Sequence, residues 1–394
     1  MSAPLHVGID ATTWWNDRGF GRFTRELVKA LLVPDSAFRY TLVVDRESAG
    51  ELPSGVRVAS IATQRSLTEA AVQDGARSPL DMLAMSRLVR RERFDLVFFP
   101  AVYSYFPLLA RVPCVVAFHD TIAERYPELV FPTRRNKLFW DIKVAIAKRQ
   151  ATRIMTVSRA SAEDLERILH IPRKRIDVIT EGPDPIFRKL DDPAAAQSVR
   201  ARLGIDATDT LLVYVGGLSP HKNLLGLLRA MPSVLAQRPD VRLAIVGDTS
   251  GKGFYDNVAE LKRFVNAHPQ LQARVLFTGY VSDQDLVQLY NTAAALVLPS
   301  LWEGFGLPAV EAMACGLPVL ASRRGSLPEV IADTGLLFEP DDPADISRNI
   351  LNMLNEPGLC ARLSGLAVER AKGFSWERGA RLAEASFLRA LGRG

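Results

Sequence analysis

The chain carries Pro299-Ser-Leu-Trp-Glu-Gly-Phe-Gly-Leu-Pro-Ala-Val-Glu-Ala-Met-Ala-Cys-Gly316 directly after the apolar run Ala295–Leu298. The run predicts a buried strand. A short helix should follow, with Pro308 at its first position and Gly316 past its end, since these residues favour those places. Gly304 and Gly306 lie in the loop between strand and helix and leave room for a ligand at the backbone. The free N–H groups of the first helical turn favour phosphate there.

The same alternation of strand and helix continues through the chain. Short apolar and β-branched runs predict strands at His6–Ala11, Tyr40–Val44, Val56–Ile61, Asp95–Phe99, Cys114–Phe118, Arg153–Val157, Asp177–Thr180, Leu211–Val215, Val241–Val246, Arg274–Phe277, Ala295–Leu298, Pro318–Ala321 and Leu336–Phe338. Several of these runs are apolar on both faces, which is typical of a parallel sheet covered by helices. The sequence therefore predicts doubly wound α/β architecture.

A chain of 394 residues is too long for one ordinary core and predicts two domains. Prolines and aspartates gather between Gly182 and Ala196, which indicates an interdomain linker. We expect an N-terminal α/β domain over residues 1–185 and a C-terminal one over residues 186–374. A last helix within residues 375–394, with Ser375 as its N-cap, is expected to cross back to the N-terminal domain.

Composition limits the location and the partners of the protein. The net charge is +5, and three cysteines, Cys114, Cys315 and Cys360, lack the spacing of metal ligands. A basic surplus of this size suits an anionic ligand or an acidic membrane face, and we predict no nucleic-acid partner. No secretory leader is visible after Met1, and no apolar run reaches the roughly 18 residues that a membrane span needs. These features predict the cytoplasm or the inner face of a membrane.

Glu303 and Glu311 flank the predicted phosphate-binding turn. Two carboxylates there cannot both bind phosphate, but each can accept hydrogen bonds from sugar hydroxyls. The segment resembles the Glu-x7-Glu motif of the retaining GT-B glycosyltransferases of family 4, and the resemblance spans nearly the whole chain. It implies two Rossmann-like domains that face each other across a cleft. It also implies that Glu303 contacts the transferred sugar and Glu311 the nucleotide ribose, while the amides of Phe305, Gly306 and Leu307 face the sugar and phosphates.

A second loop, Val215-Gly-Gly-Leu-Ser-Pro-His-Lys-Asn223, follows a buried strand. A lysine in such a loop can neutralise a departing diphosphate. The loop resembles the family's phosphate-binding loop, with Lys222 at the lysine position. Many members carry an arginine where Gly217 stands, and Gly217 is expected to line the donor site. Arg22 and His221 are the candidates for the second phosphate cation.

A third loop, Arg18-Gly-Phe-Gly-Arg-Phe-Thr-Arg-Glu-Leu27, follows the first predicted strand. Gly19 and Gly21 open a helix start that can approach phosphate, and the loop resembles the glycine-rich first loop of the family. The dinucleotide fingerprint of nicotinamide oxidoreductases needs a third glycine where Thr24 stands. That class is therefore the least favoured reading of the sequence.

His119 and Asp120 stand at the carboxyl end of a buried strand, the edge at which open α/β sheets bind ligands. The resemblance implies that His119 lies beside the reacting sugar, where it hydrogen-bonds the sugar or positions the acceptor. Asp120 has three readings: it orients His119, holds the acceptor or caps the next helix.

The segment from Arg134 to Arg153 predicts a basic helix with an apolar face. Leu138, Phe139, Ile142, Ala145 and Ile146 form this apolar face. We favour packing of this face on the sheet. The alternative is a helix that lies against an acidic bilayer and presents a lipid-linked acceptor.

The resemblance implies a retaining hexosyltransferase, with mannose or glucose as the expected sugar. The co-substrate would be a GDP- or UDP-linked sugar, with no other cofactor and no metal, and Glu303, His119 and Lys222 would carry the catalysis. The acceptor would be a glycan or a lipid-linked glycan in bacterial polysaccharide or glycolipid synthesis. Two alternatives stay open: a non-catalytic partner subunit that binds nucleotide sugar, and a sugar-nucleotide epimerase of the same fold.

Overall fold

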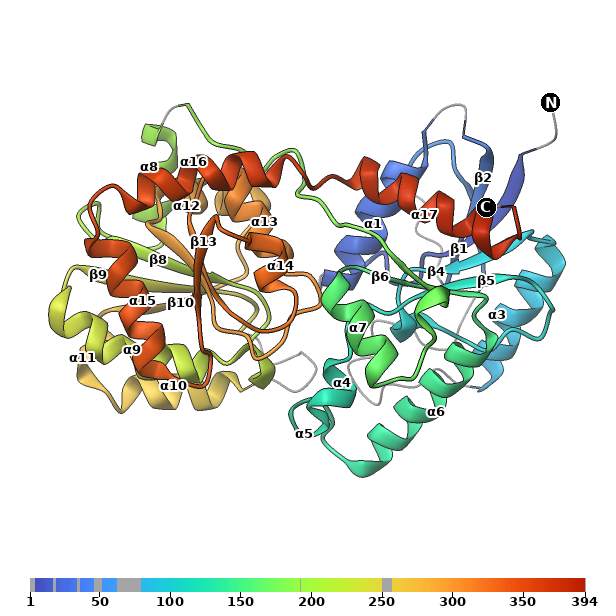
Figure 1. Cartoon of the computed structure of the whole chain (residues 1–394), viewed down its shortest axis with the longest axis horizontal. Coiled ribbons are helices and arrows are strands. Elements are labelled where there is room, and N and C mark those ends of the chain that lie inside the picture. The colour runs from blue at the N-terminus through green and yellow to red at the C-terminus, as the bar shows by residue number, and fades with distance from the viewer. Residues whose placement is uncertain are drawn as a thin grey trace. The chain divides into compact units, whose positions relative to one another are not determined.

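The computed structural model describes residues 4–16, 19–33, 36–45, 52–61, 79–191, 193–249 and 257–393. The chain forms two compact units (Figure 1). The first comprises Met1–Pro127, Phe131–Glu181 and Trp376–Gly394, and the second comprises Glu128–Val130 and Gly182–Ser375. Arg18 of the predicted first loop lies outside the described residues.

The first unit contains a seven-stranded parallel sheet in the order β3-β2-β1-β4-β5-β6-β7. Its strands are β1 (Leu5–Asp10), β2 (Phe38–Val44), β3 (Arg57–Ser60), β4 (Leu96–Phe99), β5 (Cys114–Ala117), β6 (Arg153–Thr156) and β7 (Ile176–Val178). Its helices are α1 (Gly19–Leu31), α3 (Pro79–Glu92), α4 (Ile122–Arg125), α6 (Arg134–Gln150), α7 (Arg159–Arg167) and α17 (Trp376–Ala390). The short α5 (Pro127–Val130) comes between α4 and α6 in the chain, and its residues Glu128–Val130 belong to the second unit.

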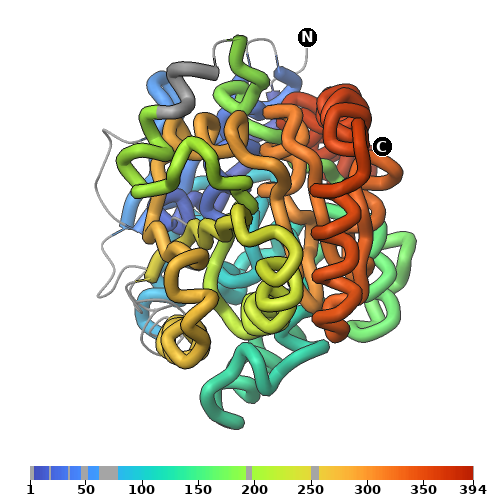
Figure 2. Tube along the Cα trace, turned by 90° about the vertical axis from the view of Figure 1, so that its left-hand side faces the viewer, coloured from blue at the N-terminus to red at the C-terminus, as the bar shows by residue number. Residues whose placement is uncertain are grey.

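The second unit contains a six-stranded parallel sheet in the order β10-β9-β8-β11-β12-β13. Its strands are β8 (Thr210–Val215), β9 (Val241–Val246), β10 (Val275–Gly279), β11 (Ala295–Leu298), β12 (Val319–Ser322) and β13 (Gly335–Phe338). Its helices are α8 (Pro193–Arg202), α9 (Leu224–Gln237), α10 (Val258–Asn266), α11 (Pro269–Gln272), α12 (Asp283–Thr292), α13 (Leu307–Ala314), α14 (Leu327–Ile331), α15 (Pro343–Asn355) and α16 (Leu359–Ala371). Figure 2 turns the view onto this unit, in which α15 packs along α9.

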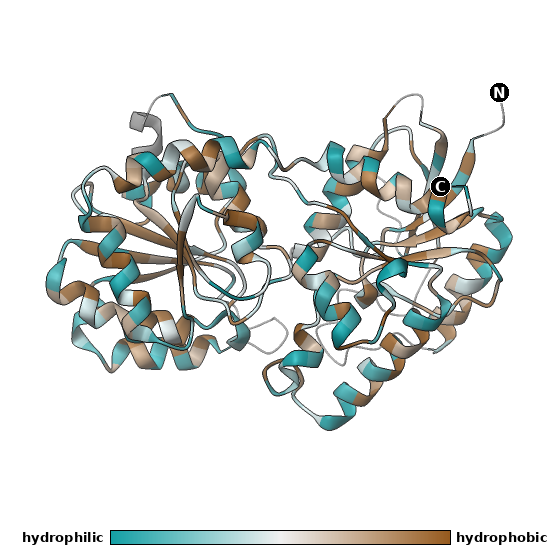
Figure 3. Cartoon of the chain, viewed as in Figure 1, coloured by the Kyte–Doolittle hydropathy of each residue, from teal (hydrophilic) through white to brown (hydrophobic). Residues whose placement is uncertain are grey.

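Both sheets are doubly wound, which confirms the predicted fold class. The chain starts each sheet at an inner strand, builds outward to one side and then returns to build the other. The strands are the most hydrophobic part of each unit, whereas the helices alternate apolar and polar faces (Figure 3). The order reverses between β1 and β4 in the first unit and between β8 and β11 in the second. In such sheets ligands bind outside the carboxyl ends of the strands at this reversal.

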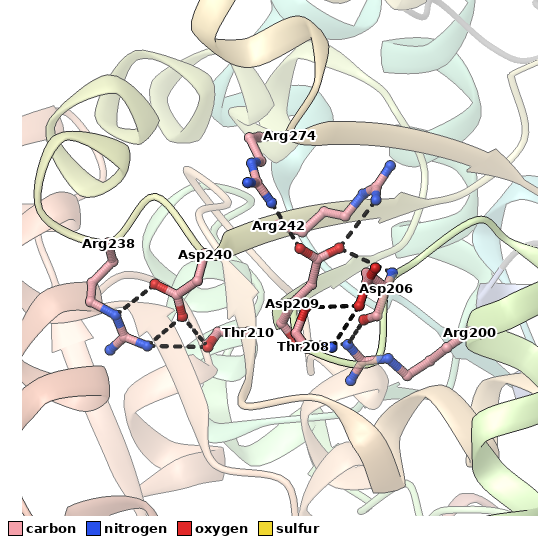
Figure 4. A network of polar contacts seen from close by, with 9 residues as sticks. All are labelled: Arg200, Asp206, Thr208, Asp209, Thr210, Arg238, Asp240, Arg242 and Arg274. Carbon is pink, nitrogen blue, oxygen red and sulfur yellow. Dashed lines mark hydrogen bonds and ion pairs between the residues drawn. The ribbon is translucent and has the colours of Figure 1, made fainter.

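Ion pairs connect the amino ends of the strands of the second sheet, opposite the carboxyl ends (Figure 4). Asp209, just before β8, pairs with Arg242 at 3.1 Å and with Arg274 at 2.8 Å. Asp240, just before β9, accepts two hydrogen bonds from Arg238, at 2.9 and 2.7 Å. These bonds lower the pKa of Asp240 well below its usual range, so the carboxylate is charged. The contacts of Asp209 hold together the starts of β8, β9 and β10.

Helix α17 packs on the sheet of the first unit. Phe387 lies against Phe38 and Phe98, with ring centroids 5.8 and 5.2 Å apart. The hydroxyl of Ser386 donates to the carboxylate of Asp177, the central residue of β7, at 2.6 Å. These buried contacts place the last helix of the chain in the same unit as the first strand.

Three predicted boundaries are wrong by a few residues. The linker predicted to reach Ala196 gives way to α8 at Pro193, because proline is well placed in a first helical turn. Helix α6 ends at Gln150 rather than at Arg153, which begins β6. Helix α13 begins at Leu307, so Pro308 is its second residue rather than its first.

The apolar face predicted for α6 is the larger correction. Leu138, Phe139 and Ile142 are 58%, 48% and 48% exposed, so these side chains do not pack on the sheet. Val144 and Ala147 are buried in the core instead, with Trp140 and Ile146 packed against it. Ile146 was part of the predicted face, but the other residues of that face are exposed, so the core contact of α6 consists mainly of residues that the sequence reading had not chosen.

Candidate active site

An ion pair between Lys222 and Glu303 lies at the candidate site of the second unit. Lys222 ends the short 3-10 turn Pro220–Lys222 after β8, and Glu303 lies in the loop after β11. The ammonium of Lys222 lies 2.8 Å from each carboxylate oxygen of Glu303. The hydroxyl of Ser300 donates to the same carboxylate at 2.6 Å. Because β8 and β11 are the neighbours at which the strand order reverses, the pair lies where a ligand is expected.

The charges of this site are set by burial and by Lys222. Burial alone would raise the pKa of Glu303, but the charge and hydrogen bonds of Lys222, with the bond from Ser300, hold it below its usual value. Burial lowers the pKa of His221 to about 4, with a further contribution from Lys222. His221 is therefore neutral near pH 7 in the protein without a bound anion, and it stays a candidate for the second phosphate cation together with Arg22.

The loop that carries Glu303 is held from a segment that the sequence analysis did not single out. The hydroxyl of Ser326 donates to the carbonyl oxygens of Glu303 and Phe305, at 3.1 and 2.8 Å. Gly325 has φ +64, and a Cβ there would lie 2.7 Å from the Glu303 carbonyl oxygen. Only glycine fits at this position. Gly325 and Ser326, which follow β12, therefore fix the backbone of the loop that carries the Glu303 carboxylate. No sequence pattern near residue 303 indicates this contact.

Helix α13 begins at the end of this loop. Gly306 has φ +93, and a Cβ there would lie 2.7 Å from Leu327, which explains the second glycine of the motif. Leu307 is the first helical residue, and Glu311 lies one turn further and is 2% exposed. The amides of Phe305, Gly306 and Leu307 thus lie at a helix N-terminus, which favours an anion.

The loop after β8 is shaped by Tyr214 and Asn223. The hydroxyl of Tyr214 donates to the carbonyl of Gly217 at 2.6 Å. Asn223 has φ +54, and its amide donates to the carbonyls of Pro299 and Pro340, at 3.1 and 2.7 Å. Asn223 thus joins the ends of three strands. Gly217 is exposed, and a Cβ built on it meets no atom beyond its chain neighbours within 4 Å, so a side chain can begin there without a clash.

His119 follows β5 in the first unit, next to the strand-order reversal. Its Nε2 lies 2.8 Å from the carbonyl oxygen of Pro100, and because a carbonyl only accepts, Nε2 carries the proton. Burial lowers the pKa of His119 to about 4, although the bond to Pro100 raises it, so the ring is neutral near pH 7. Nδ1 is then an acceptor, 3.9 Å from an oxygen of Glu181. These two acceptors suit a donor hydroxyl, such as that of a sugar.

Asp120 is placed as one of its three readings predicted. Its carboxylate accepts a hydrogen bond of 2.9 Å from the amide of Ile122, the first residue of α4. This is the capping role, which satisfies an amide that has no partner within the helix.

Gly19 and Gly21 open α1, which follows the loop after β1. A Cβ on Gly21 would lie 2.0 Å from the carbonyl oxygen of Asn16, whereas a Cβ on Gly19 meets no atom within 4 Å. Arg25 holds the same loop by donating to the carbonyls of Trp14 and Asn16, at 2.6 and 2.9 Å. Of the two glycines, only Gly21 is required by the packing.

We expect Gly21→Ala and Gly19→Ala to have opposite effects. Alanine normally stabilises a helix by about 1 kcal/mol relative to glycine, and Gly19→Ala should retain that gain. Gly21→Ala should instead destabilise by about 1–3 kcal/mol, because the loop at Asn16 must move. Thermal unfolding of both variants measures the difference. Equal melting temperatures would contradict the close approach of helix and loop.

Glu124 was missed by the sequence analysis. It lies on α4 and accepts a hydrogen bond of 2.6 Å from the indole of Trp140. Burial raises the pKa of Glu124 to about 7, and the charge of Asp120 contributes. The ring of Trp140 lies 5.0 Å from that of Tyr103, which stacks on Phe20 of α1 at 5.1 Å. A single glutamate in a polar stretch of sequence gives no indication that its side chain is buried.

Metal ligands do not gather in the described part of the chain: there, no three histidine, cysteine, aspartate or glutamate side chains lie close enough together to hold an ion. Among the same residues no helix is both long and apolar enough to cross a membrane.

Both halves of the chain match known sequence families. Residues 18–186 match the family described as Glycosyltransferase Family 4. Residues 196–369 match the family described as Glycosyl transferases group 1. The first match covers most of the first unit and ends a few residues past the boundary at Glu181, and the second match lies within the second unit.

Two curated proteins illustrate the sequence similarity. The O-antigen chain mannosyltransferase B of Escherichia coli is 34% identical over 267 residues, which cover 67% of this chain and 67% of that protein. The D-inositol 3-phosphate glycosyltransferase of Rhodococcus jostii (strain RHA1) is 33% identical over 234 residues, which cover 58% of this chain and 50% of that protein. The chain thus spans about half the length of the second relative.

Two solved structures share the fold over nearly the whole chain. Sucrose-phosphate synthase from Thermosynechococcus elongatus has a TM-score of 0.74 at 20% identity and covers 99% of this chain and 100% of its own. Anabaena Alr3699/HepE in complex with UDP-glucose has a TM-score of 0.73 at 22% identity and covers 96% of this chain and 98% of its own. With matches to both halves, and a 34% identical relative matched over two thirds of its length, the chain belongs to the group 1, family 4 glycosyltransferases.

Proposed function

We propose that the protein is a retaining, metal-independent hexosyltransferase. It would move mannose or glucose from a GDP- or UDP-linked donor to a hydroxyl of a glycan or lipid-linked acceptor, in bacterial polysaccharide or glycolipid synthesis. The E. coli relative is a mannosyltransferase of the O-antigen chain, and the HepE structure holds UDP-glucose. These two names support mannose and glucose as the sugars to test first. The proposed place of action is the cytoplasm or the inner face of the membrane.

The contact between Lys222 and Glu303 carries this proposal. One cation and one ionised carboxylate lie together at the strand-order reversal, beside the N-terminus of α13. A nucleoside diphosphate sugar presents both complements: phosphate for the ammonium and the helix amides, and hydroxyls for the carboxylate. When the donor binds, Lys222 would exchange a carboxylate oxygen of Glu303 for a phosphate oxygen.

In the proposed reaction the bond between the anomeric carbon and the diphosphate oxygen breaks. The acceptor oxygen bonds to the same face of the sugar, and its proton passes to the departing phosphate. Lys222 and the amides of Phe305, Gly306 and Leu307 would stabilise the charge that develops on the diphosphate. Glu303 would orient the sugar, Glu311 the ribose, and neutral His119 would accept a hydrogen bond from a hydroxyl.

A non-catalytic partner subunit that binds nucleotide sugar is the second candidate. One observation favours it: Gly217 carries no side chain and His221 is neutral, so Lys222 has no cationic neighbour at these two positions of its loop. Such a subunit would bind the donor without turning it over.

Thermal unfolding with UDP, GDP, ADP and dTDP tests the donor site. One nucleotide at 100 times its dissociation constant should add about 2.7 kcal/mol to the native state. Its mannose and glucose derivatives are then tested for transfer, and the anomeric configuration of the product is read by NMR. Retention with turnover supports the proposal, and inversion contradicts it. Binding without turnover, with acceptor present, favours the partner subunit, and turnover without any acceptor favours an epimerase.

A further inference from the structure

Helix α6 of the first unit carries an exposed apolar stripe. Leu138 and Phe139 lie four and three residues before Ile142, and all three are exposed, as is Ala145, one turn further along. This spacing places them on one side of the helix. Brown and teal bands alternate along α6 in Figure 3. An exposed stripe of large apolar side chains marks a surface that another body covers.

The same helix carries a concentration of positive charge. The helix contains one acid, Asp141, which pairs with Lys137 at 2.6 Å. It contains six cations: Arg134, Arg135, Lys137, Lys143, Lys148 and Arg149. Six cations against one anion leave +5, which equals the net charge of the whole chain. The rest of the protein is thus neutral in sum, and its basic surplus is concentrated on α6.

The cations border the apolar stripe. Arg134 and Arg135 are exposed at its start and Arg149 at its end. The guanidinium of Arg135 lies over the ring of Phe139, 5.4 Å from its centre. Apolar tips with flanking arginines are typical of a helix that lies in the interface of an anionic bilayer.

Contacts on the inner side hold α6 in this orientation. Trp140 donates to Glu124 at 2.6 Å, Lys143 to the carbonyl of Tyr103 at 3.0 Å, and Lys148 to the carbonyl of Leu169 at 2.8 Å. Val144 and Ala147 are buried in the core of the unit. The helix cannot turn its stripe inward without breaking these contacts, so the stripe stays available to a partner.

We propose that the stripe formed by Leu138, Phe139, Ile142 and Ala145, with Arg134, Arg135 and Arg149, docks the first unit on an anionic lipid bilayer. A second copy fits less well, because a twofold contact through α6 would bring two helices of charge +5 together. Anionic headgroups satisfy the arginines while the apolar side chains enter the interface. The docking does not depend on the donor site, so its failure and the failure of the transferase proposal are separate results.

Vesicle sedimentation of the full chain tests the docking. Vesicles of equal parts phosphatidylglycerol and phosphatidylcholine should bind the wild type, and vesicles of phosphatidylcholine alone should bind it at least about tenfold less. Leu138→Ser/Phe139→Ser/Ile142→Ser should lower binding to anionic vesicles by about tenfold or more. Arg134→Gln/Arg135→Gln/Arg149→Gln should lower it by up to about a hundredfold and remove most of its dependence on salt.

The matched controls change similar side chains elsewhere. Val33→Ser/Leu80→Ser/Leu366→Ser removes three exposed apolar side chains outside α6, and Arg348→Gln/Arg362→Gln/Lys372→Gln removes three exposed cations. Both controls should bind anionic vesicles like the wild type. All variants are first checked for unchanged circular dichroism and for donor binding.

Three results would overturn the proposal. The first is that the wild type fails to bind anionic vesicles, and the second is that it binds both vesicle types equally. The third is that the α6 variants bind anionic vesicles as well as their controls do. Light scattering gives a fourth: a dimer that the serine variant of α6 abolishes would assign the stripe to a second copy of the chain.

Discussion

Replacing Glu303 with glutamine is expected to lower kcat for sugar transfer by about 10²–10³-fold, while the Kd of the nucleoside diphosphate changes by less than about threefold. The carboxylate is held ionised by Lys222 and Ser300, so it accepts strong hydrogen bonds from sugar hydroxyls. Glutamine keeps the shape and loses the charge. Because the nucleoside diphosphate carries no sugar, its affinity should stay close to that of the wild type.

Initial rates of transfer and calorimetric titration with the diphosphate measure the two effects. Glu356→Gln is the matched control, because Glu356 is a half-exposed carboxylate paired with Arg362 on the surface. If Glu303→Gln transferred sugar at the wild-type rate, the carboxylate would have no part in the mechanism. An equal loss of diphosphate affinity would place Glu303 at the hydroxyls of the nucleoside instead of those of the transferred sugar.

Replacing Lys222 with alanine should weaken diphosphate binding by about 10–100-fold, with a much smaller effect on the monophosphate. The ammonium is the cation that the β8 loop brings to the strand-order reversal, and a second phosphate group adds charge for it to bind. The kcat of transfer should fall as well, by about 10²–10³-fold, because the departing diphosphate loses its counter-charge.

The same substitution removes the partner of Glu303, so it should also destabilise the second unit by about 1–3 kcal/mol. The double variant Lys222→Ala/Glu303→Gln should recover this stability without recovering diphosphate affinity, which separates folding from binding. Adding Gly217→Arg to Lys222→Ala should restore part of the affinity, because no atom lies within 4 Å of a Cβ at that position. If Lys222→Ala weakened monophosphate and diphosphate equally, the lysine would not face the second phosphate.

Much of the fold could be read from the sequence. All thirteen predicted strands are present, because runs such as Leu211–Val215 are apolar on both faces and have few alternatives to a covered parallel sheet. The loops after β8 and β11 were also readable, since glycine, proline and a charged residue mark them locally. That their side chains meet as an ion pair required the strand order, which brings residues 222 and 303 to neighbouring strands.

The tertiary structure alone decided which chemistry these residues carry. The tautomer of His119 depends on the carbonyl of Pro100, and the near-neutral pKa of Glu124 on burial beside Trp140. Ser326 holds the Glu303 loop from 23 residues away. Helix α6 shows the reason most clearly: its sequence is apolar on two faces, and periodicity identifies apolar faces but not which of them meets a core. Only the long-range packing, which buried Val144 and Ala147, left Leu138, Phe139 and Ile142 exposed.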